Sequence, residues 1–218
     1  ALLFGLLLVS ISANAAAKGK TKKPGGLNFT VPRDGDWKMH TIHAGPSGAD
    51  GVKLADINGD GRLDVVAPFE ESGSVYVHIN PGKGACRKPW RRVKVGNPKA
   101  PEDAFWGDLD GDGILDVISC PEKDPLTIHW APKDKKKLLS SDSWSSSQFK
   151  SSTMAWMQGW SIQLDGKNGL DLVVGGKGAN QILHWFESPK DPRKLSEWKP
   201  HPICHDVSWT MGIRFKDM

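Results

Sequence analysis

The stretch Asp56-Ile57-Asn58-Gly59-Asp60-Gly61-Arg62-Leu63-Asp64, followed directly by Val65-Val66, decides how this chain folds. Oxygen-bearing side chains stand at positions 1, 3, 5 and 9 of these nine residues, and glycines stand at positions 4 and 6. A hard cation such as Ca²⁺ takes roughly six to eight oxygen ligands at about 2.3–2.6 Å, and a tightly curled loop supplies several of them. Glycine permits the curl because it adopts backbone angles that other residues resist. The stretch is therefore predicted to be a cation-binding loop.

The same loop returns as Asp108-Leu109-Asp110-Gly111-Asp112-Gly113-Ile114-Leu115-Asp116, followed by Val117-Ile118. Aligned on the first loop position, further copies begin at Gln163 and Asp217, in steps of 52, 55 and 54 residues. An aromatic residue and a basic residue stand upstream of each copy, and a strand-like run that contains a histidine follows three of them, at His78, His129 and His184. Periodicity at several independent positions indicates a repeat protein.

Within each repeat, strand-like runs alternate with turns of Gly, Pro, Asn and Asp, and no segment keeps a 3.6-residue apolar spacing. One strand leads from the tryptophan, the next enters the loop, the third leaves it and the fourth carries the histidine. This pattern predicts an all-β fold, a β-propeller of four-stranded blades. We expect about three blades and the start of a fourth here, and about seven in the whole protein. Three blades and a remnant as a complete domain is the alternative, although it leaves an open sheet edge.

The domain boundaries follow from composition. Residues 1–17 are interpreted as a truncated secretory signal peptide, because an apolar run ends at the small residues Ala13-Asn14-Ala15. A buried core helix is the alternative for the apolar run. Residues 18–30 are expected to form a basic flexible linker, and residues 31–218 the repeats, incomplete at the C-terminus. The serine-rich run at 140–152 is interpreted as a loop between repeats. We therefore expect a secreted, periplasmic or cell-surface protein without stable membrane insertion.

Charge and cysteine content limit the partners. The formal charge of +4 favours acidic partners such as anionic polysaccharide, although the basic segments are equally consistent with solvated loops. A nucleic-acid partner is not expected, because the chain carries an export signal and no recognisable nucleic-acid-binding module. The three cysteines, Cys86, Cys120 and Cys204, leave two alternatives open: one disulfide with a free thiol, or a partner thiol outside this sequence.

The two loops, each followed by a β-branched pair, resemble the FG-GAP/VCBS repeats of integrin-α-type β-propellers over roughly residues 37–218. An EF-hand is excluded, because the residue at position 12 is Ala67 or Ser119 rather than glutamate. The resemblance implies a loop between the first two strands of a blade, with metal ligands at positions 1, 3, 5 and 9 and at the carbonyl of position 7. The implied Ca²⁺ ligands are Asp56, Asn58, Asp60, Asp64 and the carbonyl of Arg62, then Asp108, Asp110, Asp112, Asp116 and the carbonyl of Ile114.

The third copy, residues 163–171, departs from this pattern. Gln163 at position 1 is a neutral amide and Lys167 at position 5 is a cation. We predict that Lys167 reaches Asp165 and Asp171 in place of a metal, so that this loop keeps its shape without one. Two Ca²⁺ sites are therefore expected rather than three.

The histidines and tryptophans have two interpretations each. His78, His129 and His184 are expected to pack within blades, and a metal or catalytic cluster on the propeller axis is the alternative. Tryptophans that recur in register are expected in the core. The better candidates for a sugar-binding face are Trp106, Trp144, Trp156, Trp160 and Trp209.

The function predicted from these observations is an exported, calcium-stabilised propeller that acts as a binding or adhesion scaffold for a glycan or a cell-surface protein. The alternative is the propeller part of a carbohydrate-active enzyme, such as a polysaccharide lyase or an aldos-2-ulose-type sugar dehydratase. No catalytic residues are assigned, because the chain contains no nucleophile elbow, phosphate loop or HExxH motif.

Overall fold

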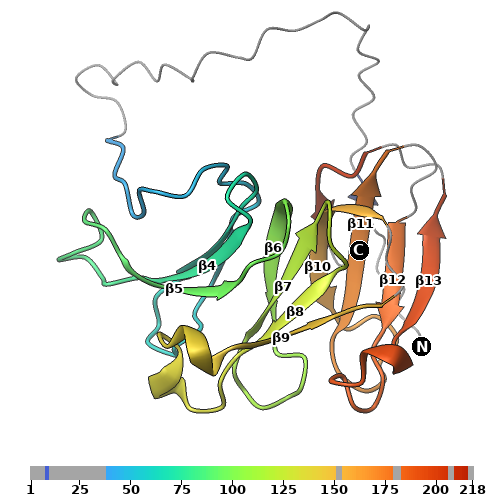
Figure 1. The fold of residues 1–218 in the computed structure, drawn as a ribbon. Coiled ribbons are helices and arrows are strands. Elements are labelled where there is room, and N and C mark those ends of the chain that lie inside the picture. Colours follow the sequence, from blue (N-terminus) through green and yellow to red (C-terminus); the bar gives the residue numbers. More distant parts are fainter. Residues whose placement is uncertain (1–7, 10–37, 151–153, 179–182, 206–208, 216–218) are drawn as a thin grey trace, which may run out of the picture.

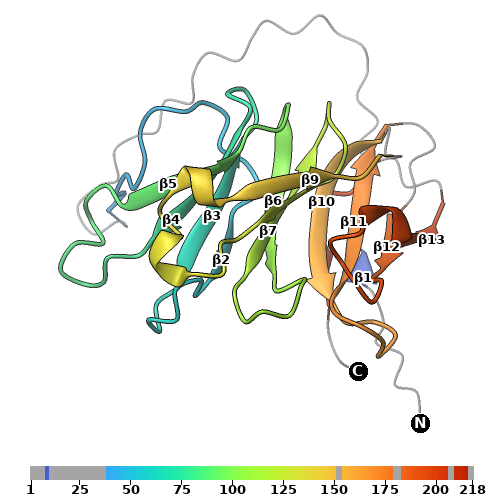
Figure 2. The ribbon, with the colours of Figure 1, turned by 60° about the horizontal axis from the view of Figure 1, so that its bottom comes forward.

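The computed structural model describes residues 8–9, 38–150, 154–178, 183–205 and 209–215. It is an all-β structure in which three four-stranded antiparallel sheets stand side by side in chain order, as blades of a β-propeller (Figure 1). The same arrangement is seen after a 60° rotation (Figure 2). In the described part of the chain, no helix has the length and apolar character needed to cross a membrane.

The strands of each blade are consecutive in the chain. The first blade contains β2 (Lys53–Ala55), β3 (Asp64–Phe69), β4 (Ser74–Ile79) and β5 (Arg91–Gly96). The second contains β6 (Pro101–Gly107), β7 (Asp116–Pro121), β8 (Thr127–Trp130) and β9 (Ser145–Gln148). The third contains β10 (Ala155–Ile162), β11 (Asp171–Lys177), β12 (Leu183–Glu187) and β13 (Lys199–Cys204). Three short 3₁₀ helices, η1 (Lys135–Lys137), η2 (Ser141–Ser143) and η3 (Leu195–Glu197), lie in the last connections of the second and third blades.

The expected signal peptide and linker lie outside the described residues, apart from one pair. That pair is β1 (Leu8–Val9), which lies antiparallel to β14 (Ile213–Arg214). Trp37 and the truncated fourth loop at Asp217 also lie outside the described residues, so the domain boundaries remain predictions.

Each cation loop connects the first two strands of its blade, as the family resemblance implied. The expected order of strands within a repeat was wrong, however. The strand led by the tryptophan is the fourth strand of the preceding blade: β5 begins directly after Trp90, and β13 directly after Trp198. A sequence repeat shows how often each kind of strand recurs along the chain. It does not show which strand is the first of a blade. The pairing of β5 with β4 and of β13 with β12 determines the phase.

The serine-rich run was also assigned wrongly as a loop. Residues 145–148 form β9, which pairs along its whole length with β8. The hydroxyls of two of its serines lie within hydrogen-bond distance of side-chain ring nitrogens on β8. The Ser147 hydroxyl accepts from Trp130 Nε1 at 3.0 Å, and the Ser146 hydroxyl lies 2.8 Å from His129 Nδ1. Serine has little strand preference of its own, so this edge strand depends on partners that the local sequence does not reveal.

The core consists of the layers between blades. The residue after each loop packs toward the preceding blade and the next residue packs toward the following one, because successive side chains in a strand point to opposite faces. Val117 accordingly lies in the apolar cluster between the first two blades, and Ile118 in the cluster between the last two. Val66 and Leu172 complete the same two clusters from either side. The β-branched pairs therefore hold blade against blade.

The cysteines form no disulfide with one another. All three are free thiols, and they differ in exposure: Cys120 is buried, Cys86 is half-buried and Cys204 is exposed. Burial raises the pKa of the Cys120 thiol well above its usual value. Cys120 therefore behaves as a small apolar core residue.

Candidate metal centres

The second loop, between β6 and β7, gathers three carboxylates. Oxygens of Asp108, Asp110 and Asp112 all lie within 4.8 Å of one another. Oδ1 of Asp108 and Oδ1 of Asp110 are buried and have no hydrogen-bond partner. Like charges this close repel one another, and buried oxygens without partners are costly, unless a cation neutralises both effects. The donor set consists of hard oxygens, so these residues fit the Ca²⁺ that the family resemblance implied.

The predicted glycine conformations are present in this loop. Gly111 and Gly113 have φ values of 70° and 83°, in the left-handed region where a side chain is strained. Their backbone turns bring N–H groups onto the carboxylates: Gly113 donates to Asp108 Oδ2 and Ile114 donates to Asp112 Oδ1, each at 3.0 Å. The Ile114 side chain is buried, which anchors the end of the loop in the core.

The last carboxylate of the loop ties it to the rest of the blade. Asp116 is buried, and it accepts the N–H of Leu109 at 3.3 Å and the N–H of Ala131 at 2.8 Å. The same two bonds recur in the other loops: Asp64 accepts from Ile57 and Asn80, and Asp171 accepts from Leu164 and Ser188. These bonds close each loop and fasten it to the end of the third strand. Each oxygen keeps a second lone pair, so the metal-ligand roles of Asp64 and Asp116 stay predictions.

Burial makes Asp116 difficult to ionise. It raises the pKa of this carboxyl from 3.8 to about 7, against the opposing effect of the hydrogen bond from Ala131, and the charge of Asp110 raises it further. An adjacent cation would act in the opposite direction, because positive charge favours the carboxylate form. Burial is therefore the main cause of the raised pKa of Asp116, the charge of Asp110 adds to it, and the charge of Arg193 opposes it.

The first loop, between β2 and β3, has the same backbone but a different set of contacts. Asp56 accepts hydrogen bonds from the N–H groups of Gly59, Asp60 and Gly61 at 2.7–3.1 Å, and the bond from Gly61 contributes most to lowering the pKa of Asp56. Asn58 donates to Asp60, and the Arg62 guanidinium pairs with Asp60. All the predicted ligand residues lie on this loop, but their oxygens are more fully hydrogen-bonded than those of the second loop.

In the third loop, between β10 and β11, side-chain nitrogens make the central contacts. Gln163 Nε2 donates to the carbonyls of Lys167 and Gly169, which are positions 5 and 7 of the loop. Lys167 Nζ pairs with Asp165 Oδ2 at 3.0 Å, as predicted. Its second carboxylate is Glu187 at 3.8 Å rather than Asp171, because both oxygens of Asp171 already accept backbone N–H groups. The predicted contact of Lys167 with Asp171 was therefore wrong. Gln163, which donates to two loop carbonyls, makes more contacts within the loop than Lys167 does.

The three histidines lie in three different blades and not in a common cluster. His129 is buried between hydroxyls, with Nε2 2.9 Å from Ser119 Oγ and Nδ1 2.8 Å from Ser146 Oγ. His78 bonds His43 at 3.0 Å, and His184 packs against the rings of Trp156 and Phe186. Packing within blades is therefore confirmed.

The tryptophan prediction was partly wrong. Trp106, Trp144 and Trp156 are buried between blades and offer no face for stacking. Of the five candidates, Trp160 in β10 and Trp209, which pairs with Lys177 of β11, are exposed, at 36% and 49%. Sequence alone could not separate the two groups, because a large aromatic residue fits a blade interface as well as a binding face.

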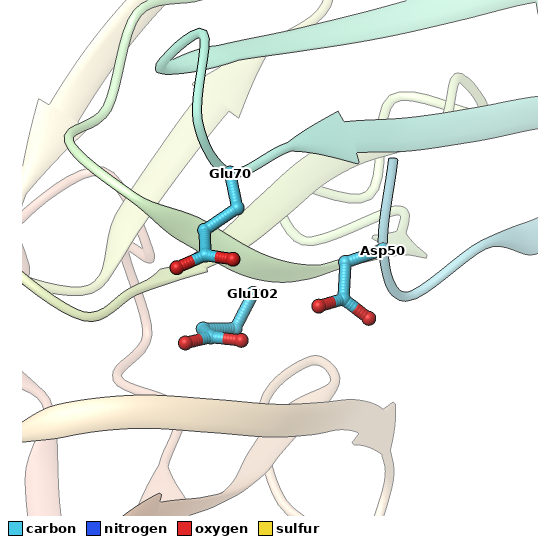
Figure 3. A group of neighbouring side chains, drawn as sticks. All are labelled: Asp50, Glu70 and Glu102. Carbon is cyan, nitrogen blue, oxygen red and sulfur yellow. The ribbon is translucent and has the colours of Figure 1, made fainter. Parts of the chain in front are cut away.

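A second acidic group lies at the opposite end of the blades from the cation loops. Figure 3 shows the carboxylates of Asp50, Glu70 and Glu102 turned toward a common space, with oxygens within 4.8 Å of one another. Asp50 precedes β2, Glu70 follows β3 and Glu102 lies in β6. Lys177 of the third blade balances part of this charge, with Nζ at 2.5 Å from Glu102 and 3.1 Å from Glu122.

Sequence reasoning missed this group, although the repeat contains the signal. Asp50 and Glu102 each stand six residues before their loops, and Glu70, Glu122 and Lys177 each stand 14 residues after a loop begins. Alignment on the loops would therefore have placed charged residues at equivalent blade ends. Burial raises the pKa of Glu102, and the ammonium of Lys177 opposes that rise.

Comparison with known protein families agrees with this geometry. Residues 56–119 match the family model of the FG-GAP-like repeat. The match begins at the first residue of the first loop and ends within β7, just beyond the second loop. The resemblance drawn from the two loops is thus confirmed for this segment, and an FG-GAP-like repeat within stacked blades indicates a β-propeller-like scaffold.

Proposed function

We propose that this FG-GAP-repeat chain is an exported β-propeller that binds Ca²⁺ at its first two loops and serves as a scaffold for a glycan or a cell-surface protein. The observation that carries the proposal is the group formed by Asp108, Asp110 and Asp112, with two buried oxygens that have no partner. A divalent cation would supply the positive charge that this group lacks. Binding to the folded state alone stabilises a protein by mass action, so the metal would have a structural role.

The chain's own residues do the rest of the work in each loop. Residues with positive φ at positions 4 and 6 curl the backbone, and in the second loop the carboxylates at positions 1, 3 and 5 converge. Asp64 and Asp116 fasten the loop to the third strand of the blade. Three loops at the same end of three adjacent blades would give a stiff rim, and the exposed Trp160 of β10 is a candidate for contact with a partner near it. Trp209, which pairs with Lys177 at the other end of β11, is a candidate for contact at the opposite end of the blades.

Export is the second part of the proposal. It is supported by the apolar run that ends at Ala13-Asn14-Ala15, and it is consistent with a calcium requirement, since extracellular modules bind Ca²⁺ with affinities in the millimolar range. Residues 1–30, preceded by a start methionine and a short lysine segment that supplies the positively charged n-region and fused to a reporter that matures only after export, test this part. A reporter that stays inside the cell would contradict it.

Calcium binding is tested by thermal unfolding and by titration calorimetry with CaCl₂. We expect a stoichiometry of two and a melting temperature that falls in chelator and recovers with added Ca²⁺. Asp112→Asn should lower the stoichiometry to one, because it removes a charge from the second loop. Asp142→Asn, at an exposed position in η2, is the matched control and should bind two ions. An unchanged melt in chelator, together with no binding heat, would refute the proposal.

A further inference from the structure

We infer that Arg193 is a positioning residue for the second cation loop: from the third blade it holds Asp110 in the orientation that binds a cation. This inference rests on the proposed function, because it concerns the same loop. It adds that the affinity of this loop for Ca²⁺ depends on a residue of another blade. Arg193 lies between β12 and β13, 83 residues from Asp110 in sequence.

In this contact two nitrogens of the guanidinium donate to the same carboxylate oxygen. Arg193 Nε and Nη2 donate to Asp110 Oδ2 at 3.0 and 2.6 Å. The other oxygen, Oδ1, is buried without a partner, as is Oδ1 of Asp108. The side chain of Asp110 is 10% exposed. The guanidinium therefore occupies Oδ2 and leaves the buried Oδ1 of Asp110 available as a ligand in the group with Asp108 and Asp112.

The Arg193 side of the contact is supported by further contacts. The N–H of Arg193 donates to Asp191 Oδ1, and Trp198 Nε1 donates to the carbonyl of Pro192, so the segment that carries Arg193 is fixed. The guanidinium lies 4.5 Å from the ring centroid of Trp130, and that ring is itself held by Ser147. An arginine stacked in this way loses little further freedom when it grips a carboxylate.

Two effects of Arg193 on cation binding oppose each other. Its charge repels a divalent ion, which weakens binding. Its hydrogen bonds orient a ligand, and removal of such supporting bonds typically weakens metal binding by about 10–100-fold. The loop offers four carboxylates, against three in the first loop, so negative charge remains in excess even with Arg193 in place. Because Arg193 is also half-exposed, with water screening its charge, we expect orientation to dominate.

The first loop provides a natural comparison. Lys135 of the second blade stands near that loop and lowers the pKa of Asp56 through its charge, but no hydrogen bond joins the two side chains within the described residues. Each of these two loops thus has a basic residue of the following blade near it. Among the described contacts, only the residue at the second loop, Arg193, donates two hydrogen bonds to a loop carboxylate. Removal of Lys135 should change charge alone.

The experiment measures the Ca²⁺ dissociation constant of the second loop by calorimetry with CaCl₂, in the full chain carrying Asp60→Ala to disable the first loop. In this background we compare two variants. Arg193→Lys keeps the positive charge but removes the paired hydrogen bonds of the guanidinium, and Arg193→Gln removes both the charge and the paired hydrogen bonds. Lys194→Gln removes a neighbouring exposed charge and is the control. A second background keeps the first loop intact and carries Asp112→Asn to disable the second loop. In that background Lys135→Gln removes a nearby positive charge without removing a hydrogen bond to the loop.

We expect Arg193→Lys and Arg193→Gln to weaken the second site by about 10–100-fold, Lys194→Gln to leave it unchanged, and Lys135→Gln not to weaken the first site. Tighter binding by Arg193→Gln would mean that charge dominates, and unchanged binding by Arg193→Lys would mean that the paired hydrogen bonds are unnecessary; either result overturns the inference. If Arg193→Gln does not fold, Arg193→Lys decides alone. A parent protein that binds no Ca²⁺ would overturn the proposed function itself, which separates the two failures.

Discussion

At the scale of single residues, burial determines the ionisation of the histidines. His129 is fully enclosed, and both ring nitrogens lie within hydrogen-bond distance of serine hydroxyls. Burial lowers its pKa from 6.5 to about 4, and it does the same for His78, where the neighbouring His43 adds to the effect. Both rings are therefore neutral in the folded protein near pH 7, although a free histidine begins to take up a proton there.

This predicts a specific sensitivity to acid. The unfolded chain protonates His129 near pH 6.5 and the folded chain only near pH 4, so this residue favours unfolding increasingly as the pH falls between these values. The full effect is about 3 kcal/mol. His129→Gln should be less stable at pH 7.5 but lose less stability between pH 6.5 and 4.5, as measured by urea unfolding. The exposed His205→Gln is the control, and parallel pH curves for wild type and His129→Gln would contradict the prediction.

At the scale of elements, the three loops share one backbone and differ in what occupies their centre. Each has its last carboxylate fastened to two backbone N–H groups, and each has left-handed residues at positions 4 and 6, including Asn168 at φ 53° in the third. The third loop reaches this shape with the amide of Gln163 and the ammonium of Lys167 as internal donors. The loop shape therefore does not by itself require a cation.

Conversion of the third loop should create a cation site. The double variant Gln163→Asp with Lys167→Asp restores carboxylates at positions 1 and 5, beside Asp165 and Asp171 that are already present. We expect the Ca²⁺ stoichiometry in calorimetry to rise from two to three, because the backbone is already in the binding conformation. Gln163→Asn with Lys167→Gln, which alters the same positions without adding carboxylates, should leave it at two. A stoichiometry of two in the double aspartate variant would show that the shared backbone is not sufficient.

At the scale of the whole molecule, one buried carboxylate connects all three blades. Asp103 in β6 accepts from Lys53 Nζ in β2 at 2.6 Å and from the N–H of Gly159 in β10 at 3.1 Å. It is fully buried, and its backbone pairs with Gly51 of the first blade. Burial raises the pKa of Asp103 to about 6, although the ammonium of Lys53 opposes the rise. The inner strands are thus joined by charge as well as by packing.

Removal of this charge should destabilise the assembly of blades. In Asp103→Asn the ammonium of Lys53, which is 15% exposed, loses its negatively charged partner. Loss of one member of a buried pair costs about 3–5 kcal/mol, and we expect a loss of about that size in urea unfolding at pH 8, where Asp103 is ionised. Glu197→Gln, which breaks the exposed pair with Lys194, should cost under about 1 kcal/mol. Similar small losses for both variants would mean that Asp103 does not hold the blades together.

The sequence by itself determined the repeat, the all-β class and the loops. These features depend on residues within a few positions of one another: glycines that allow left-handed angles, carboxylates at alternate positions, and apolar pairs that need both faces covered. For the same reason, the loop residues named as candidate ligands lie where they were expected, and their binding of Ca²⁺ awaits measurement.

Only the tertiary structure decided the features that depend on distant residues. The phase of the blades follows from strand pairing, and β9 pairs with β8 while Trp130 Nε1 donates to Ser147 and His129 Nδ1 lies within hydrogen-bond distance of Ser146. Arg193 and Asp110 are 83 residues apart, and Asp103 and Gly159 are 56 apart. No local propensity records such a contact, because its free energy arises only when folded blades bring the two groups together out of water. The loops at Asp56 and Asp108 could therefore be recognised from the sequence, whereas the contact of Arg193 with the second loop could not.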